Sequence, residues 1–258
     1  MKARLNLERY IDLLVVLIYK EWVVKYKRTI LGFIWSIIYP LILALAFYIA
    51  FKFALKLPTK NFSILIIPAV FVWQWISNSL LISQWTFISN AVIIKKYPIP
   101  KWILVLANNL IDTIHFLLAT PIIILFILFF AKIKYNLILF IMGYLLLLAI
   151  QLVFNFSISL ILATLNVFFR DIDRLLLVSL NILIFITPIF YSINSIPKNH
   201  KLLFYLNPFT PFIEAWRSLF LTGMLNYNLL ICIFYTILIF FLAVYTYRKL
   251  GYLVAEVV

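Results

Sequence analysis

The chain has 258 residues, of which 66% are hydrophobic and only 12% are charged, against roughly a quarter charged in ordinary soluble domains. A globular protein of this length cannot enclose so much apolar surface, so most of that surface must face lipid and a soluble fold is excluded. The net charge of +14 does not indicate nucleic-acid binding, because Lys and Arg fall in short segments between apolar runs, where they set topology and bind anionic lipid head groups.

The first 29 residues are predicted to form an amphipathic helix lying in the membrane interface. Charged residues recur there at helical spacing with apolar residues between them: Glu8, Arg9 and Asp12, then Lys20, Glu21, Lys25 and Arg28. This pattern is typical of a basic helix that lies on the bilayer rather than crossing it. A frayed arm in water is the alternative.

Six later stretches are long enough to cross a bilayer, which takes about 20 apolar residues. They lie near Ile30–Phe51, Phe62–Trp85, Ile103–Ala131, Leu137–Asn166, Leu175–Tyr191 and Leu229–Tyr247. Prolines within spans mark kinks, because neighbouring helices can satisfy the freed carbonyls: Pro40, Pro68, Pro121 and Pro188. The sequence predicts one all-α transmembrane domain over residues 1–258, with spans one to five in 30–191 and span six plus a tail in 229–258.

Six spans place both chain ends on one side of the membrane. Most of the 22 Lys and Arg residues, including the group before residue 29, fall on that side. Because basic residues are retained on the cytoplasmic side, both termini are predicted to be cytoplasmic.

Residues 192–228 form the one long connection, on the opposite side. Within it Thr210 is placed to cap a helix that has Pro211 at its first position and runs to about Leu221. At about 18 Å this helix is too short to cross, and it is too apolar to lie in water. We predict short re-entrant helices that dip into the outer leaflet and act as an external gate; a surface hairpin is the alternative.

Two groups of polar residues fall within predicted spans. Asn108, Asp112 and His115 share one face of span three, where an ionisable group costs about 3 kcal/mol and therefore faces protein or water. A helix–helix hydrogen-bond cluster, with Asp112 paired to His115, is favoured over a proton relay or substrate contact, since no basic residue is expected at that depth. Span four carries a polar stripe that is expected to hold helices together, with a water-lined pore face as the alternative: Gln151, Asn155, Ser159 and Asn166.

Charged residues gather at two further places. Arg170, Asp171, Asp173 and Arg174 follow span four and form a charged knot, predicted to be either a local salt-bridged cap or a contact to a partner. Glu214 and Arg217 are spaced to pair on the external helix, and as surface pairs either group contributes below about 1 kcal/mol.

The residue types needed for catalysis do not come together. His115 and His200 fall on opposite sides of the predicted membrane, Cys232 is alone, and no G-x-x-x-x-G-K-[ST] nucleotide-binding sequence occurs. We expect neither an enzyme nor a metal site, and any ATP must be bound by another chain.

Four segments in chain order resemble polysaccharide ABC exporter permeases, the membrane subunits of type-2 ABC transporters. They are YKRTILGFIW at 26–35, running on to Pro40; IIKKYPIP at 93–100; FFRDIDR at 168–174 with ITPIFY at 186–191; and NPFTPFIEAWR at 207–217. The resemblance covers nearly the whole chain.

The resemblance implies a homodimeric permease with two separate ATPase subunits that hold ATP and Mg, exporting lipid-linked O-antigen, capsule or teichoic acid across the bacterial inner membrane. It implies that spans one and five line the path, and that a cytoplasmic loop couples to the ATPase through Ile93, Lys95, Lys96, Tyr97, Pro98 and Pro100. The external gate would include Pro208, Pro211, Glu214 and Arg217. Candidate path-lining aromatics, on which sugar rings could slide, are Trp35, Tyr39, Phe47, Phe185, Phe190 and Tyr191. Lipid-facing packing is the alternative for these rings.

Three other functions stay open at this point. A drug or lipid exporter of the same superfamily would share the motifs. A membrane-embedded glycan-processing enzyme would need acidic or His clusters near an interface, for which Asp171 and Asp173 are the only candidates. A structural membrane subunit would require the motif matches to be chance.

Overall fold

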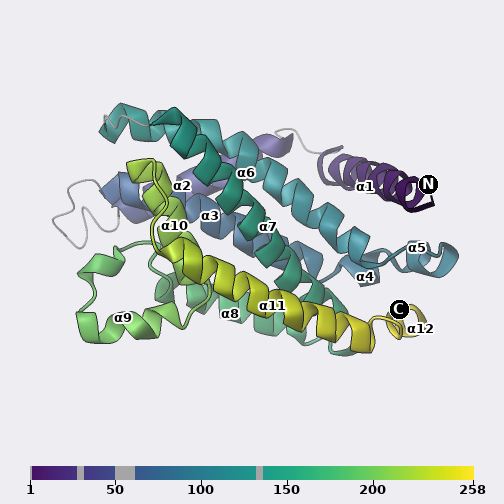
Figure 1. Ribbon diagram of the computed structural model, residues 1–258. Coiled ribbons are helices and arrows are strands. Elements are labelled where there is room, and N and C mark those ends of the chain that lie inside the picture. Colours follow the sequence, from purple (N-terminus) through teal and green to yellow (C-terminus); the bar gives the residue numbers. More distant parts are fainter. Residues whose placement is uncertain (1, 28–31, 50–61, 132–135) are drawn as a thin grey trace.

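The computed structural model describes residues 2–27, 32–49, 62–131 and 136–258, and within these ranges every regular element is helical (Figure 1). The elements in chain order are α1 (Lys2–Tyr26), the 3-10 turn η1 (Gly32–Ile34), α2 (Trp35–Ile49), α3 (Phe62–Ser83), α4 (Thr86–Ser89), α5 (Ala91–Lys96), α6 (Trp102–Ala131), α7 (Leu137–Phe168), α8 (Ile172–Ile186), the 3-10 turn η3 (Ile193–Ser195), α9 (Lys198–Tyr205), α10 (Phe209–Thr222), α11 (Asn228–Leu250) and α12 (Val254–Val257).

Four of these helices are long and apolar enough to cross a membrane, namely Leu65–Ser83 of α3, Trp102–Phe129 of α6, Leu137–Phe168 of α7, and α11. Predicted spans two, three, four and six are therefore confirmed as apolar helices. Spans one and five correspond to α2 and α8, each 15 residues or about 22 Å, shorter than the roughly 30 Å hydrocarbon layer. Residues 30–31 and 50–51 of span one lie outside the described residues. The all-α class is confirmed, and the count of six stays a prediction.

Helix α3 lies at the centre of the bundle. It contacts α2, α6, α7, α8 and α10. Of the apolar stretch of α3 that could cross a membrane, 72% is buried inside the protein, whereas the corresponding share of α11, which packs along α7, is 17%. Trp75 of α3 stacks on Phe116 of α6, with ring centroids 4.6 Å apart, and Trp216 of α10 meets both rings edge-on. Aromatic packing around α3 therefore fixes the position of the elements that surround it.

Polar side chains join α7 to its neighbours. All four members of the predicted stripe on this helix are fully buried. Ser159 Oγ donates to the Ser79 carbonyl at 3.2 Å, and Asn166 Nδ2 donates to the Gln84 carbonyl at 3.1 Å. The prediction that this stripe holds helices together is confirmed, because two of its members bond directly to backbone outside α7.

The first helix packs along α6 through Leu13, Leu14, Leu17 and Ile18. Its outward face also carries apolar residues, since Val15, Val16 and Tyr19 are all more than half exposed. The charged residues lie mainly towards its two ends. A long N-terminal helix is confirmed from Lys2 onwards, and its place in the membrane interface stays a prediction.

The fifth predicted span ends five residues earlier than expected. Helix α8 stops at Ile186, and Thr187 adopts an extended conformation with φ −72° and ψ 137°. The residue before a proline is pushed out of the helical region by the ring, so Pro188 terminates this helix rather than kinking it.

The connection between α8 and α11 differs most from its prediction. Helix α10 is enclosed by α3, α7 and α11, and most of its residues are buried. Its first turn is capped by Asn207, whose Oδ1 accepts from the Phe209 amide at 3.0 Å, whereas the predicted cap, Thr210, has a buried hydroxyl without a partner. Gly223 ends the helix at φ 72°. Because most of α10 is buried among other helices, the surface-hairpin alternative is wrong.

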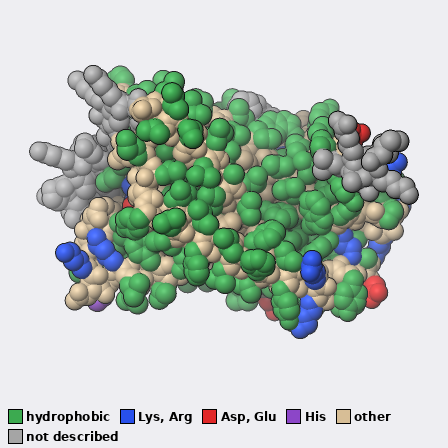
Figure 2. Space-filling model, in the orientation of Figure 1, with side chains coloured by type: hydrophobic (Ala, Val, Ile, Leu, Met, Phe, Trp, Pro, Cys, Tyr) green, Lys and Arg blue, Asp and Glu red, His purple; other side chains and the backbone are tan. Residues whose placement is uncertain are grey.

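The two ends of the bundle differ in what they carry. The N-terminus, the C-terminus, α5 and α12 lie at one end, and α9 lies at the other (Figure 1). The middle of the face shown in Figure 2 is covered by hydrophobic side chains, with Lys and Arg towards both ends. This distribution suits a protein that spans a lipid bilayer.

Candidate functional site

Helix α5 is a short exposed element at the end of the bundle that also carries both chain ends. Lys95, Lys96, Tyr97 and Pro98 are exposed, while Ile93 and Pro100 are half-buried. The Tyr97 amide donates to the Ile93 carbonyl at 3.0 Å, so the turn is closed before the two prolines. Five of the six residues from the predicted coupling segment thus lie in or beside one exposed helix, and the sixth, Pro100, begins the return to α6.

The inner side of α5 rests on parts of the chain that are remote in sequence. Ile94 is buried in a cluster that includes Leu17 of α1, Ile103 of α6 and Val254 of α12. Lys101 Nζ donates to the Gly251 carbonyl at 2.6 Å, and partial burial lowers the pKa of this ammonium group from its ordinary value. The C-terminal segment therefore supports the base of α5.

Three polar contacts tie α1 to the rest of the bundle. Lys20 Nζ donates to Asn90 Oδ1 at 2.6 Å, and Asn90 is the residue that precedes α5. Lys25 Nζ lies 3.3 Å from Asp112 Oδ1, and Tyr26 forms a hydrogen bond with His115 Nε2. The expectation that no basic residue reaches the depth of Asp112 is wrong, because α1 brings Lys25 there.

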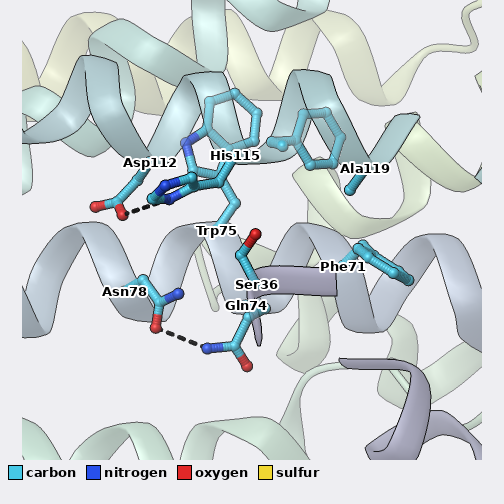
Figure 3. Close-up of a pocket in the computed structure, with 9 residues that line it drawn as sticks. Ser36, Phe71, Gln74, Trp75, Asn78, Asp112, His115 and Ala119 are labelled. Atoms are coloured by element: carbon cyan, nitrogen blue, oxygen red, sulfur yellow. Dashed lines mark hydrogen bonds and ion pairs between the residues drawn. The ribbon is translucent and has the colours of Figure 1, made fainter. Parts of the chain in front are cut away.

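Asp112 and His115 lie together on α6, as their spacing predicts. His115 Nδ1 is 3.6 Å from Asp112 Oδ1, and both side chains are buried (Figure 3). Asn108, one turn earlier, donates instead to Thr86 of α4 at 2.8 Å. These three residues therefore contact α1 and α4, as a helix–helix cluster requires, and the choice between that role and a proton relay or substrate contact stays a prediction.

Two cavities flank Lys25. One, of about 290 Å³, is lined by Glu21, Val24, Lys25, Ile82, Asn108, Ile111 and Asp112. The other, of about 300 Å³, is lined by Lys25, Tyr26, Trp35, Ser36, Tyr39, Pro40, Gln74, Asn78 and His115. A small recess in Figure 3 continues from Gln74 and Asn78 to Asp112 and His115. The second cavity thus lies where α1, α2, α3 and α6 meet.

The charged knot does not form a local salt-bridged cap in the part of the chain that the structure describes. Asp173 Oδ1 accepts from Gln84 Nε2 at 2.7 Å and from Trp85 Nε1 at 3.2 Å, so it ties the start of α8 to the end of α3. Arg170, Asp171 and Arg174 are exposed and form no ion pair with one another. A contact between these three residues and a partner stays a prediction.

Arg217 and Glu214 pair as predicted, but in the core rather than at the surface. The guanidinium is 3% exposed; it bonds to Glu214 Oε1 and to the carbonyls of Leu65, Pro188 and Ile189, the last three at 3.2, 2.7 and 3.1 Å. The expectation of a weak surface pair is wrong. These bonds join α10 to the start of α3 and to the segment after α8. Pro211 is buried and Pro208 half-buried beside them.

The aromatic residues predicted to line the path differ in how exposed their side chains are. Trp35, Tyr39 and Phe185 are more than half exposed. Phe190 is buried in the core and presents no surface to a path, because the chain turns inward after Pro188. Tyr191 is half-buried and its hydroxyl donates to the Ile186 carbonyl at 2.8 Å. The side chain of Phe47 lies outside the described residues.

Sequence reasoning did not predict that Lys25, Gln74 and Asn78 border the second cavity. Lys25 was assigned to an interfacial helix, whose packing against α6 is a tertiary contact that spacing does not reveal. The signal for the amides was present, because Gln74 and Asn78 lie one turn apart within an apolar span.

The sequence profile of the ABC-2 type transporter family matches residues 12–221. Two relatives from Klebsiella pneumoniae, each named O-antigen export system permease protein RfbA, are 33% and 34% identical to the chain. The first alignment covers 99% of this chain and 98% of the relative, and the second covers 100% and 99%. A protein of the same name from Myxococcus xanthus is 24% identical over 83% of this chain and 82% of its own length.

Proposed function

This chain belongs to the ABC-2 type transporter family, and from that premise we propose that it is the membrane subunit of an ATP-driven exporter of lipid-linked polysaccharide. The observation that carries the proposal is the full-length similarity to two O-antigen export permeases at 33% and 34% identity. The chain is a transporter subunit rather than an enzyme. Its substrate would be an O-antigen, capsule or teichoic-acid chain.

Energy for transport would come from a separate ATPase subunit, present in two copies, which binds ATP and Mg. The chain carries no P-loop sequence of its own. The partner would dock on α5, whose exposed outer side presents Lys95, Lys96 and Tyr97. Pro98 and Pro100 fix φ in the segment that follows, so a push on α5 is transmitted to α6 rather than absorbed.

The permease would act as a homodimer with its path between the copies, beside α2 and α8. Each helix presents one outward apolar stripe whose members are more than half exposed: Trp35, Tyr39, Ile42 and Leu45 on α2, and Leu175, Val178, Ile182 and Phe185 on α8. These spacings describe one face of a helix. Stripes of this width suit contact with lipid or with a second copy of the chain.

A water-filled path beside α2 has separate physical support. Trp35, at the start of α2, borders the same cavity as His115 of α6. His115 lies about 20 Å along α6 from its first residue, Trp102, at 1.5 Å per residue, so α2 begins at a similar depth in the bundle. The start of a helix has unpaired backbone amides, and at membrane depth these must be covered by protein or water. Together with η1 and residues 187–191, α2 and α8 would complete six crossings.

The orientation follows from charge. With α5 and both termini on the cytoplasmic face of the bacterial inner membrane, the basic N-terminal segment and the Lys95–Lys96 pair lie on the side that retains positive charge. The segment with α9 and α10 then lies outside, where it would act as the gate. When the two ATPases close on ATP, α5 moves, and the two permeases shift to open the path.

Co-purification with the partner ATPase tests this assignment. We expect the permease and the ATPase to form a stable complex in lipid nanodiscs with higher ATPase activity than the ATPase alone. Replacing residues 95–100 with a flexible Gly-Ser linker should abolish that stimulation. Full stimulation by the linker variant would contradict docking on α5, and a permease that never binds an ATPase would contradict the function itself.

A further inference from the structure

We propose that the cavity where α1, α2, α3 and α6 meet is a binding subsite for a neutral sugar unit of the exported polymer. The inference rests on the proposed function and adds to it a place and a ligand chemistry. The subsite consists of residues that border one cavity of about 300 Å³: Gln74, Asn78, His115, Trp35 and Tyr39.

The two amides are the first observation. Every residue of α3 from Ile66 to Leu80 is buried except Gln74 and Asn78, which are half-buried and border the cavity. Gln74 Nε2 donates to Asn78 Oδ1 at 2.7 Å (Figure 3). Because both side chains border the cavity, their remaining donor and acceptor positions are available to a ligand in it. Lipid chains cannot satisfy these positions, so the cavity holds water or a polar ligand.

The charge balance of the cavity selects the ligand class. Its cation, Lys25, lies 3.3 Å from the buried carboxylate of Asp112, so the positive charge already has a counter-charge and attracts an anion only weakly. Amide groups offer donors and acceptors side by side, which is what a hydroxyl group needs, since it both donates and accepts. The chemistry therefore favours a neutral, hydroxyl-rich ligand over a phosphate.

Two aromatic rings also border the cavity. Trp35 and Tyr39 lie one turn apart on α2, and each is more than half exposed. An aromatic face is a flat apolar surface with a negative quadrupole, against which the C–H face of a sugar ring packs. A volume of about 300 Å³ is at the lower end of the range of small-molecule sites, which suits one or two sugar rings rather than a long segment.

The test uses the permease–ATPase complex in nanodiscs and short oligosaccharides released by hydrolysis from the polymer that the source strain exports. Binding is measured by saturation-transfer NMR on the oligosaccharide. We expect saturable binding to the wild-type complex, and no competition by inorganic pyrophosphate at equal concentration. Competition by pyrophosphate would overturn the assignment to a neutral sugar.

Variants locate the binding. Gln74→Leu with Asn78→Leu removes both amides, and the half-saturation concentration should rise about tenfold or more, since each lost hydrogen bond is worth roughly threefold to tenfold. If the double variant does not assemble with the ATPase, Gln74→Leu alone is measured instead, and its half-saturation concentration should rise threefold to tenfold. Thr246→Val on α11, remote from the cavity, is the matched control and should bind as the wild type does.

The outcomes separate this inference from the function it rests on. A wild-type complex that exports polymer but shows no oligosaccharide binding, or leucine variants that bind as well as the wild type, would refute the subsite alone. A complex that neither exports polymer nor couples to an ATPase would refute the proposed function.

Discussion

At the scale of single residues, Arg217 shows how strongly burial changes the value of a charge pair. An exposed pair contributes below about 1 kcal/mol, whereas a buried guanidinium is stable only if all its donors are used. Arg217 comes close to that condition, because all three of its nitrogens donate, to one carboxylate and to three backbone carbonyls. It therefore holds α10 against the ends of two other segments.

Replacing this guanidinium should destabilise the protein severely. Arg217→Met removes the buried counter-charge of Glu214 and the donor to three carbonyls. We expect a loss of about 3–5 kcal/mol, seen as a lower thermal unfolding temperature of the purified protein. Arg217→Lys keeps the charge but not the planar fork, so its loss should be smaller. Equal stability of all three proteins would show that the pair is not held in the core.

The contact between Lys25 and Asp112 is also expected to stabilise the protein. Lys25→Met removes the cation that lies beside the buried carboxylate of Asp112, so the unfolding temperature should fall by a few degrees. Adding Asp112→Asn removes the uncompensated charge and should recover most of that loss. A double variant as unstable as the sum of the two single variants would mean that the groups do not interact.

At the scale of elements, α5 depends on the C-terminal segment beneath it. Val254 is fully buried against the cluster that holds Ile94, and Lys101 bonds to the Gly251 carbonyl. Val254→Asp places an unpaired charge in that cluster and should reduce stimulation of the partner ATPase at least severalfold, while the complex still forms. Val257→Asp, at an exposed position of the same helix, is the matched control and should leave stimulation unchanged.

The sequence predicted the helices well because hydrophobic length and proline positions are local signals. Predicted spans two, three, four and six agree with α3, α6, α7 and α11 to within a few residues, and the family resemblance drawn from four short motifs is confirmed by the family match. What the sequence could not show was partnership between remote helices. Apolar content alone did not reveal that α10 is enclosed by three other helices.

The candidate site was predictable only in part for the same reason. The exposed residues of α5 were found because a short basic segment between spans is visible in the sequence. Asp112 and His115 were found because charge within a span is conspicuous. Lys25 was missed, since its contact with Asp112 joins residues far apart in the chain.

At the scale of the whole molecule, the apolar stripes on α2 and α8 make the homodimer testable. In a Cys232→Ser background, we expect Phe185→Cys or Tyr39→Cys to form disulfide-linked dimers in native membranes under mild oxidation. Leu230→Cys on α11 is equally exposed but outside these stripes, and should stay monomeric. Cross-linking at Leu230 alone would place the interface on another face.

We propose that this chain passes a glycan polymer across the inner membrane, driven by an ATPase on another subunit. The most direct measurement is surface glycan, detected by antibody or lectin on intact cells after deletion of this gene. We expect surface polymer to be lost, to accumulate inside the cell, and to return only when the chain and an ATPase with an intact nucleotide site are both supplied. Undiminished surface polymer in the deletion strain, with no other permease present, would rule out this function.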